Sequence, residues 1–418
     1  MWVGNTFVFK GLPPRRQLDI STPPACDENN SRTSRPLDDI MLLEGLNCAL
    51  LALLLVLLHR LLYSPFSSIQ QPSQTSRRHK SRRDASVSSQ KTDEHVEISS
   101  VEHTSDSEST ESDGYTDEER VVYLARKTIL EYFKRTRVSD RFGSRKWVPE
   151  VEQKVREKLA TWDLGISDRV FEKYFATGLD ISSTAYRHTT IEAQVQVALC
   201  TFCTALFDDG FMGVEKMREF APRFTAGLPQ LHPVLQLFQT TMVNMREVYG
   251  PYSSNAMISS VLDFTNSEMF LRESKDMALG TPSSHYIEYI RLKEGFGEAY
   301  AGFIWPHATF PDSKKFVQAF PDSMNFINLI NDMFSYYKEA KAGETGTYLH
   351  TFGKVHGLTE PQVLENIVQQ TVIVVERIRA ILGDSEEREA WENFAAGYTQ
   401  FHLYTDRYKL IEIFPEYF

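Results

Sequence analysis

Helical patterns follow one another without interruption from Thr116 to the end of this 418-residue chain, and they determine the fold class. Thr116-Asp-Glu-Glu119 matches a capping box, and the apolar residues from Val121 to Phe133 follow it at helical spacing. No stretch alternates between apolar and polar residues as a half-buried strand would. Glycine and proline separate the later patterns, at Gly250-Pro251, Gly280-Thr-Pro282 and Trp305-Pro306. The sequence therefore predicts an all-α domain over residues 116–418, long enough to bury one large core.

The residues before this domain have a different composition. Residues 1–39 are rich in Pro, Ser, Asn and charge and show no periodicity, so we expect a disordered amino terminus. Residues 64–115 form a Ser-rich linker that is basic at first and then acidic. Charge runs of this kind are usually solvated, and we expect a disordered tether.

Between these two regions lies an apolar segment at residues 40–63. The 13 residues from Leu46 to Leu58 are all Leu, Ala, Val or Cys, with the exception of Asn47. The segment approaches the length of about 17 to 25 residues that a membrane-spanning helix needs, and it lies too far from the start for an ordinary secretory signal. We predict a single transmembrane helix, with an amphipathic or partner-binding helix as the alternative.

Basic residues indicate how such a helix would be oriented. Only Arg32 and Arg35 closely precede the apolar segment, and six basic residues follow it, at Arg60, Arg77, Arg78, Lys80, Arg82 and Arg83. The positive-inside rule then predicts a membrane-anchored protein whose larger domain lies in the cytosol. Without the anchor, the protein would be cytoplasmic.

Net charge and cysteine content exclude several classes of protein. The net charge of −11 and the isoelectric point of about 5.6 argue against a general nucleic-acid binder, whose surface would be basic. Four cysteines make no disulfide framework for a chain of this length. Cys200 and Cys203 lie in an apolar helical pattern, and we expect them to be small core residues, not a redox or zinc pair.

The motif Asn331-Asp-Met-Phe-Ser-Tyr-Tyr-Lys-Glu339 carries the strongest chemical signal. Asn331, Ser335 and Glu339 are spaced i, i+4 and i+8, so they share one helical face and can converge on one ion. All three donor atoms are oxygen, which favours a hard cation such as Mg²⁺. Lys338 next to such a site indicates that a phosphate supplies further metal ligands. The alternative is an amphipathic helix with a solvated polar stripe, which the many apolar and aromatic neighbours disfavour.

Three weaker motifs accompany it. An apolar helical pattern from Ile191 ends in Asp208-Asp-Gly210, where a glycine can cap the helix and two acids invite a divalent ion. Arg291 is followed by Gly295 and Gly297, which would break a helix. Asp406-Arg-Tyr408 near the end offers donors for a phosphate. Taken singly, each is equally typical of a solvated helix end or a surface ion pair.

Together, and in this order on an all-helical chain, the four motifs resemble the class I terpene cyclases of the fungal trichodiene synthase family. The resemblance runs from about Val121 to the end of the chain. It implies an all-α class I terpenoid synthase bundle around a central cavity, and a terpene synthase, which is a carbon–oxygen lyase. The implied reaction is the Mg²⁺-dependent ionisation of farnesyl diphosphate, or alternatively geranyl diphosphate, followed by cyclisation of the carbocation to a sesquiterpene.

The resemblance also implies roles for individual residues. Asp208 resembles the aspartate that bridges two magnesium ions, and Asn331, Ser335 and Glu339 resemble the chelate of a third. The residues that resemble hydrogen-bond donors to the diphosphate are Arg291, Lys338, Arg407 and Tyr408. The resemblance implies four catalytic residues, Asp208, Arg291, Arg407 and Tyr408. Asp209 is expected to pair with Arg407 on closure of the site, and Arg291, Glu294 and Gly295 match the sensor, linker and effector positions. Aromatic candidates for the cavity lining, each of which could equally be plain core, are Phe207, Tyr300, Trp305 and Phe334.

Two departures from the family pattern keep other hypotheses open. Met212 stands where the usual D-D-x-x-D motif has its last acid, and ten residues follow Tyr408, fewer than in many relatives. A non-catalytic relative that binds a diphosphate or a lipid at the membrane is the first alternative. An elongating prenyltransferase is the second, which the absence of a second Asp-rich motif disfavours. A homodimer is compatible with the sequence, and the product skeleton is not determined by it.

Overall fold

The computed structural model describes residues 116–418. The predicted disordered terminus at 1–39, the apolar helix at 40–63 and the linker at 64–115 all lie outside the described residues. Within 116–418, no helix combines the length and the apolar character that crossing a membrane requires.

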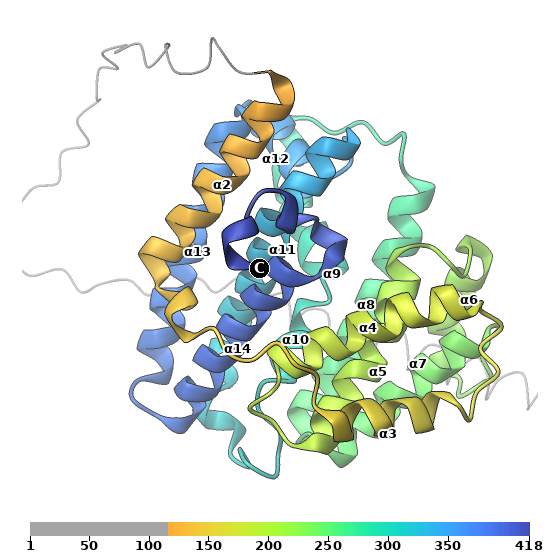
Figure 1. Cartoon of the computed structure of the whole chain (residues 1–418). Coiled ribbons are helices and arrows are strands. Elements are labelled where there is room, and N and C mark those ends of the chain that lie inside the picture. Colours follow the sequence, from red (N-terminus) through yellow and green to blue (C-terminus); the bar gives the residue numbers. More distant parts are fainter. Residues whose placement is uncertain (1–115) are drawn as a thin grey trace, which may run out of the picture. The chain divides into compact units, whose positions relative to one another are not determined.

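The described part of the chain is helical throughout and contains no strand, so the all-α prediction is confirmed for it (Figure 1). Its α-helices are α2 (Asp117–Thr136), α3 (Pro149–Leu159), α4 (Asp168–Thr184), α5 (Ile191–Asp208), α6 (Val214–Thr225), α7 (Pro233–Asn244), α8 (Pro251–Glu273), α9 (Ser284–Glu294), α10 (Gly297–Gly302), α11 (Phe320–Ala342), α12 (Tyr348–His356), α13 (Glu360–Leu382) and α14 (Glu386–Tyr404). Short 3-10 helices complete the chain at η1 (Val138–Arg141), η2 (Met245–Glu247), η3 (Thr281–Ser283), η4 (Ser313–Lys315), η5 (Val317–Ala319), η6 (Asp406–Tyr408), η7 (Leu410–Glu412) and η8 (Pro415–Tyr417).

The first described helix begins where the capping box predicted. The backbone N–H of Glu119 donates to Thr116 Oγ1 at 3.3 Å, and the backbone N–H of Thr116 donates to the Glu119 carboxylate at 2.8 Å. Each side chain thus satisfies a backbone donor that the first turn of a helix would leave unpaired.

Two helices that are apolar on nearly every face form the centre of the bundle. In α5 almost every residue from Ala193 to Phe207 is buried, including the free cysteines Cys200 and Cys203, which are core residues as predicted. This helix packs against α3, α4 and α7, and α11 packs against α2, α10 and α13. A helix without a polar face has no orientation in which it can lie at the surface, so the sequence of each helix dictates its central place.

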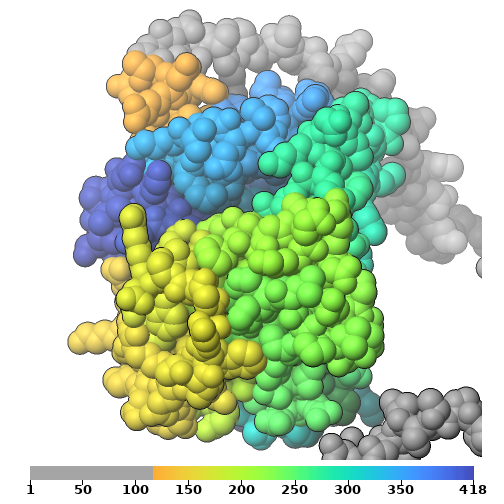
Figure 2. Space-filling view, turned by 90° about the vertical axis from the view of Figure 1, so that its right-hand side faces the viewer, coloured from red at the N-terminus to blue at the C-terminus, as the bar shows by residue number. Residues whose placement is uncertain are grey.

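The helices form two halves with α9 and α10 between them. One half contains α3 to α7, and the other contains α2 and α11 to α14 (Figure 1). In the space-filling view, segments coloured yellow to green cover the lower part of the face and the later, blue segments lie above them (Figure 2). The final residues close the second half, because Arg126 on α2 pairs with Glu416 at 2.7 Å.

Candidate active site

A cavity of about 1290 Å³ lies between the two halves. It brings together residues from motifs that are as far apart as Asp208 and Tyr408 in the sequence. The predicted site residues that line it are Asp208, Asp209, Arg291, Glu294, Gly295, Tyr300, Asn331, Ser335, Lys338, Glu339, Arg407 and Tyr408.

The first wall of this cavity is α11. The helix is continuous from Phe320 to Ala342, so Asn331, Ser335 and Glu339 occupy one face on successive turns, as their spacing predicted. Ser335 is buried, and Glu339 is largely buried with Lys338 Nζ at 3.1 Å from its carboxylate. The regular backbone of the helix therefore fixes three oxygen donors and one cation relative to one another.

The second wall is the end of α5. Asp208 is the last residue of the helix, and Gly210 follows with a φ of +70°, a conformation that suits glycine. Arg272 on α8 donates to the backbone carbonyl of Asp208. A side chain at position 210 would meet the Arg272 guanidinium at 2.9 Å, so a glycine allows α8 to hold this turn closely.

Arg407 connects the end of the chain to this second wall. Its guanidinium donates to Asp208 Oδ2 at 2.6 Å and to Asp209 Oδ1 at 3.0 Å, so both acids hold this arginine. The pair with Asp209 on closure of the site stays a prediction. Asp209 also accepts from Tyr174 and from Lys173, at 3.1 Å for the lysine. Burial alone would raise the pKa of Asp209, but Arg407, Tyr174 and Lys173 outweigh it and lower that pKa.

Arg291 joins α9 to α11. It forms an ion pair with Asp332 at 2.7 Å, and it donates to the carbonyl of Asn328 at 3.2 Å. Glu294 lies one helical turn further along α9, at 3.5 Å from the guanidinium. Burial opposes the charge on Arg291, but Asp332 and Glu294 outweigh it and raise the pKa of the guanidinium. The arginine is therefore always charged and faces the cavity.

Helix α9 ends three residues after Arg291, next to the two glycines that predicted an interruption there. α9 ends at Glu294, Phe296 has a φ of +51°, and α10 starts at Gly297. A Cβ at position 295 would lie 2.0 Å from Asn328 Oδ1, so any larger residue there would force the Asn328 side chain to move. The break turns the chain inward and places α10 at the floor of the cavity.

Buried carboxyl groups crowd the polar end of the cavity. Burial raises the pKa of Asp332 to about 7, although Arg291 opposes the shift. Burial also raises the pKa of Glu268 on α8 to about 8, with Asp208 and Glu294 adding to the effect. Like charges this close repel one another, and a bound cation would relieve that repulsion.

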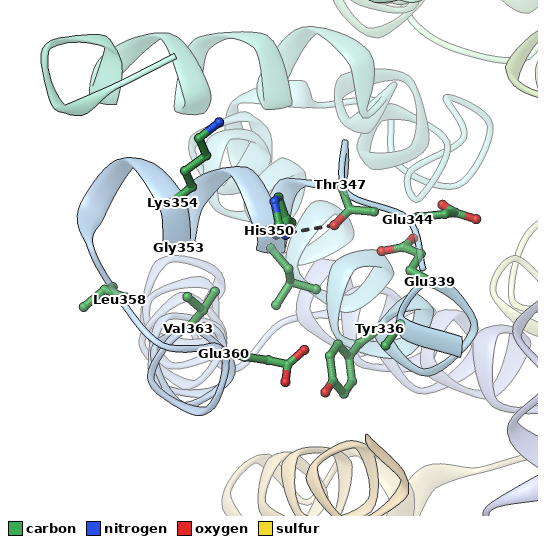
Figure 3. A pocket seen from close by; sticks show the side chains of 12 residues that line it. Tyr336, Glu339, Glu344, Thr347, His350, Gly353, Lys354, Leu358, Glu360 and Val363 are labelled. Carbon is green, nitrogen blue, oxygen red and sulfur yellow. Dashed lines mark hydrogen bonds between the residues drawn. The ribbon is translucent and has the colours of Figure 1, made fainter. Parts of the chain in front are cut away.

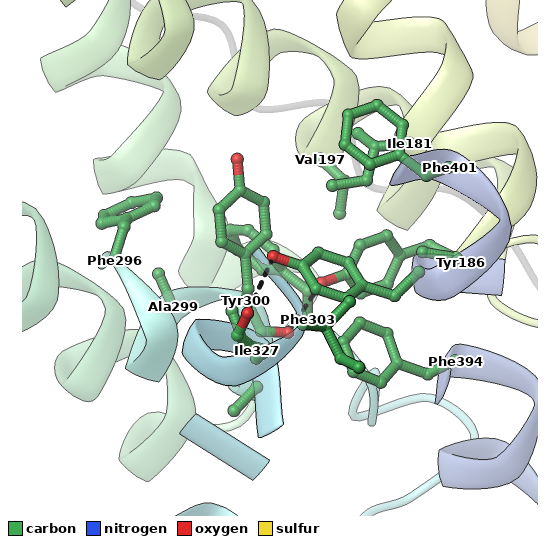
Figure 4. Close-up of a cluster of buried hydrophobic side chains, with 14 of the residues drawn as sticks. Ile181, Tyr186, Val197, Phe296, Ala299, Tyr300, Phe303, Ile327, Phe394 and Phe401 are labelled. Atoms are coloured by element: carbon green, nitrogen blue, oxygen red, sulfur yellow. Dashed lines mark hydrogen bonds between the residues drawn. The ribbon is translucent and has the colours of Figure 1, made fainter. Parts of the chain in front are cut away.

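The apolar end of the cavity is lined by aromatic and small side chains from several helices, namely Ile181, Thr201, Phe264, Phe296, Tyr300, Tyr398 and Phe401. Tyr300 on α10 closes the floor, where its hydroxyl pairs with Thr201 Oγ1 at 3.2 Å. Behind it the core is solid: Tyr186 donates to the carbonyl of Tyr300 at 2.7 Å, and Phe303 and Phe394 lie close by (Figure 4).

Three of the four predicted lining residues lie elsewhere. Phe207 packs against Phe220 and Phe264, and Phe334 packs against Tyr132, Phe133 and His402. Trp305 stacks on Phe316, with ring centroids 4.8 Å apart, and donates to the carbonyl of Glu387 at 3.0 Å. All three are core side chains and not part of the lining. The rotation of α5 and α11 points Phe207 and Phe334 away from the cavity, and Trp305 lies in the turn after α10, where it packs on Phe316. Of the four, only Tyr300 lines it.

Several residues that line or shape the cavity were not among the predicted ones. Asp332, the partner of Arg291, follows Asn331 directly and could have been suspected from its position in the motif. Glu268, Arg272, Tyr174 and His402 lie on helices with no recognised motif, and nothing in their local sequence indicates that they face the site. Met212, which replaces the usual acid, is buried and does not line the cavity.

A smaller pocket of about 470 Å³ adjoins the site. It lies between α11, α12 and the start of α13, and Figure 3 shows its lining residues, among them Tyr336, Leu358 and Val363. Glu339 lines both this pocket and the main cavity. Helix α12 therefore lies beside the α11 wall, between the smaller pocket and the main cavity.

The donor set fits a divalent cation. Carboxylate, amide and hydroxyl oxygens face one cavity from α5 and α11, and hard divalent ions prefer oxygen ligands. Within residues 116–418, no group of three or more His, Cys, Asp or Glu side chains forms a metal site by itself. A site here would have to combine Asp208 or Glu339 with the amide, the hydroxyl and ligands from a substrate.

Comparison with known proteins shows that terpene synthases have similar sequences. The sequence model of the trichodiene synthase family matches residues 154–417. Monoterpene synthase 25 of Postia placenta is 35% identical over 295 residues, which are 70% of this chain and 87% of that protein. Longiborneol synthase of Gibberella zeae is 32% identical over 230 residues, which are 53% of this chain and 68% of that protein. Among solved structures, linalool/nerolidol synthase from Streptomyces clavuligerus is 16% identical with a TM-score of 0.49, covering 62% of this chain and 98% of that one.

The family match spans more than half of the chain and includes all four motifs. Enzymes of this kind generally use divalent metal ions, in agreement with the oxygen donors on both walls of the cavity. This chain belongs to the trichodiene synthase family and is a class I terpene synthase, a lyase.

Proposed function

We propose that this enzyme is a Mg²⁺-dependent sesquiterpene cyclase that acts on farnesyl diphosphate. The observation that carries the proposal is the arrangement of one cavity with oxygen donors and cations at one end and an aromatic floor at the other. A prenyl diphosphate has the same two parts, an anionic head and an apolar chain. Geranyl diphosphate is the alternative substrate.

Asp208 on one wall, and Asn331, Ser335 and Glu339 on the other, would hold the metal, which we propose to be three magnesium ions. When bound, magnesium neutralises charge on the diphosphate and makes it a better leaving group. Arg291, Lys338, Arg407 and Tyr408 bind and orient the diphosphate, since each can donate to its oxygens. Burial raises the pKa of the Tyr408 hydroxyl to about 12, so it is a neutral donor at physiological pH.

The apolar floor then controls the carbocation. The rings of Phe296, Tyr300 and Phe401 line this end of the cavity, and their negatively polarised faces would stabilise positive charge there. Arg291, Glu294 and Gly295 are proposed as the sensor, linker and effector that couple diphosphate binding to the break between α9 and α10. This coupling is supported by the ion pairs from Arg291 to Asp332 and Glu294.

Product analysis tests the proposal. The purified full chain is incubated with Mg²⁺ and farnesyl, geranyl or geranylgeranyl diphosphate, and volatile products are identified by gas chromatography and mass spectrometry. We expect a cyclic sesquiterpene from farnesyl diphosphate, and none from the Asn331→Ala or Glu339→Ala variant. Diphosphate binding without turnover would instead identify a non-catalytic relative. A longer diphosphate formed with added isopentenyl diphosphate would identify an elongating prenyltransferase.

We also propose that residues 40–63 anchor the enzyme in a membrane with its catalytic domain in the cytosol. The support is the apolar composition of the segment and the basic residues after it. A fluorescent reporter fused after residue 115 should sediment with membranes, and glycosylation at Asn29 in Asn29-Asn-Ser31 should mark a lumenal amino terminus. A reporter that stays in the soluble fraction would contradict the anchor.

A further inference from the structure

His402 is a buried side chain that contacts Asn331, one of the candidate metal ligands. It lies on α14 and is 1% exposed. Its ring packs among aromatic neighbours, with centroid distances of 4.5 Å to Tyr398, 4.6 Å to Tyr408 and 5.0 Å to Phe401. Its only edge toward the cavity faces Asn331, the first donor of the α11 wall.

The two ring nitrogens of His402 have different partners. Nδ1 lies 2.8 Å from the backbone carbonyl of Tyr398, which only accepts hydrogen bonds, so Nδ1 carries the proton. Nε2 lies 3.4 Å from the amide nitrogen of Asn331, which only donates. The contacts thus fit one tautomer of a neutral ring, in which Nε2 presents its lone pair to Asn331.

This lone pair decides which way the Asn331 amide points. With Nδ2 directed at His402, Oδ1 lies 3.4 Å from the guanidinium of Arg291, on the side of the cavity. A flipped amide would set its oxygen against the lone pair of His402 and its nitrogen against the donors of Arg291. The third partner is the Tyr408 hydroxyl at 3.4 Å, which can donate or accept and therefore tolerates either orientation.

We propose that His402 is a positioning residue, which turns the Asn331 amide so that its oxygen is available to the divalent cation. This inference depends on the proposed function, because it assumes that Asn331 binds the metal. Groups that orient a metal ligand through a hydrogen bond typically change metal affinity by about 10- to 100-fold when they are removed. Arg291 contributes to the same orientation through Asn331 Oδ1 at 3.4 Å, but this guanidinium also pairs with Asp332 and donates to the carbonyl of Asn328.

The test compares His402→Phe with His188→Phe in the full chain. Phenylalanine keeps a ring among the aromatic neighbours but removes the acceptor. His188 is a half-buried histidine whose Nε2 lies 3.0 Å from a backbone carbonyl, that of Ile304, and it does not line the cavity, so it serves as the control. Mn²⁺ binding is titrated by electron paramagnetic resonance in the presence of inorganic diphosphate. We expect affinity to fall at least about tenfold in His402→Phe and to stay within about twofold in His188→Phe.

A second pair of variants separates orientation from packing. In an Asn331→Asp background both side-chain donor atoms are oxygen, so the direction of the group no longer matters. His402→Phe should then weaken Mn²⁺ binding less than about threefold. An equal loss in both backgrounds, or no loss in the Asn331 background, would overturn the inference. Failure of the unmodified chain to bind Mn²⁺ with diphosphate would instead refute the proposed function.

Discussion

The two walls of the cavity hold their oxygen donors in different ways. On α11, the donors lie along the C-terminal half of a regular helix, and the side chain of Glu339 is 16% exposed. At the end of α5, the Asp208 side chain is 44% exposed and rests on a turn that depends on Gly210 and Arg272. Asp208 and Asp209 are held chiefly by ion pairs with Arg407.

This difference indicates that the two walls respond differently to substrate. The α11 wall is preorganised, because its helix fixes the donors before anything binds. We propose that the α5 wall is exchangeable: Arg407 would leave the acids and bind the diphosphate, and Asp208 would then be free to bind the metal. One rigid wall and one responsive wall would let the enzyme form its complete site only when a diphosphate is present.

The largest expected effect is the loss of a donor from the rigid wall. Glu339→Ala removes a carboxylate from α11. Its nearest charged contact is Lys338, which is a cation and cannot replace a carboxylate as a metal ligand. We expect kcat to fall by about 100- to 1000-fold with an unchanged melting temperature. Steady-state kinetics and thermal unfolding measure both quantities. Activity within about tenfold of the unmodified enzyme would show that α11 does not bind the metal.

On the α5 wall, the loss in kcat/KM should differ between substitutions of Asp208 and of Asp209. Asp208→Asn removes the proposed metal ligand, and we expect a loss in kcat/KM of about 100-fold. Asp209→Asn weakens only the hold on Arg407, Tyr174 and Lys173, and a loss of about tenfold is expected. The same kinetic assay compares the two variants. A greater loss for Asp209 than for Asp208 would reverse the roles that the geometry assigns to them.

Stability tests the close approach of α9 to the α11 wall. Gly295→Ala would place a methyl group 2.0 Å from Asn328 Oδ1, so we expect the free energy of unfolding to fall by about 1 to 3 kcal/mol. Gly143→Ala is the matched control, because no heavy atom lies within 4 Å of the added group. Its effect should stay within about 0.5 kcal/mol. Urea unfolding measures both, and equal effects would show that the approach of α9 to α11 is looser than described.

The smallest expected effect concerns pH. Because burial, Asp208 and Glu294 raise the pKa of Glu268 to about 8, the folded protein binds this proton more tightly than the unfolded chain does. The stability contributed by the protonated group is complete below the ordinary pKa of about 4.5 and is lost as pH rises through about 8. Without metal, Glu268→Gln should therefore gain a few degrees in melting temperature relative to the unmodified protein between pH 5 and pH 9. A constant difference across this range would contradict the shifted pKa.

Local periodicity explains which parts of the structure were predictable from the sequence. The all-α fold, the capped start at Thr116, the single face of α11 and the break after Arg291 follow from spacing over a few residues. Spacing does not reveal how a helix is rotated in the bundle. For this reason the sequence left both a lining and a core position open for Phe334, one residue before Ser335, and the structure places it in the core.

Contacts between distant segments were the other limit. Trp305 stacks on Phe316 and Phe320, and only the fold shows that these rings satisfy each other away from the cavity. Glu268 and His402 reach the site from α8 and α14 without a motif of their own. Asp332 was overlooked because one step along a helix turns a side chain by about 100°, and its partner Arg291 lies on another helix.

The most direct test of the two-wall account is a crystal structure of the full chain with Mg²⁺ and inorganic diphosphate. The account predicts metal density within about 2.0 to 2.1 Å of Asp208 on α5 and of Asn331, Ser335 and Glu339 on α11. It also predicts that Arg407 has left Asp208 to contact the diphosphate. Metal bound to one wall alone, or Arg407 still paired with Asp208 beside a bound diphosphate, would contradict it.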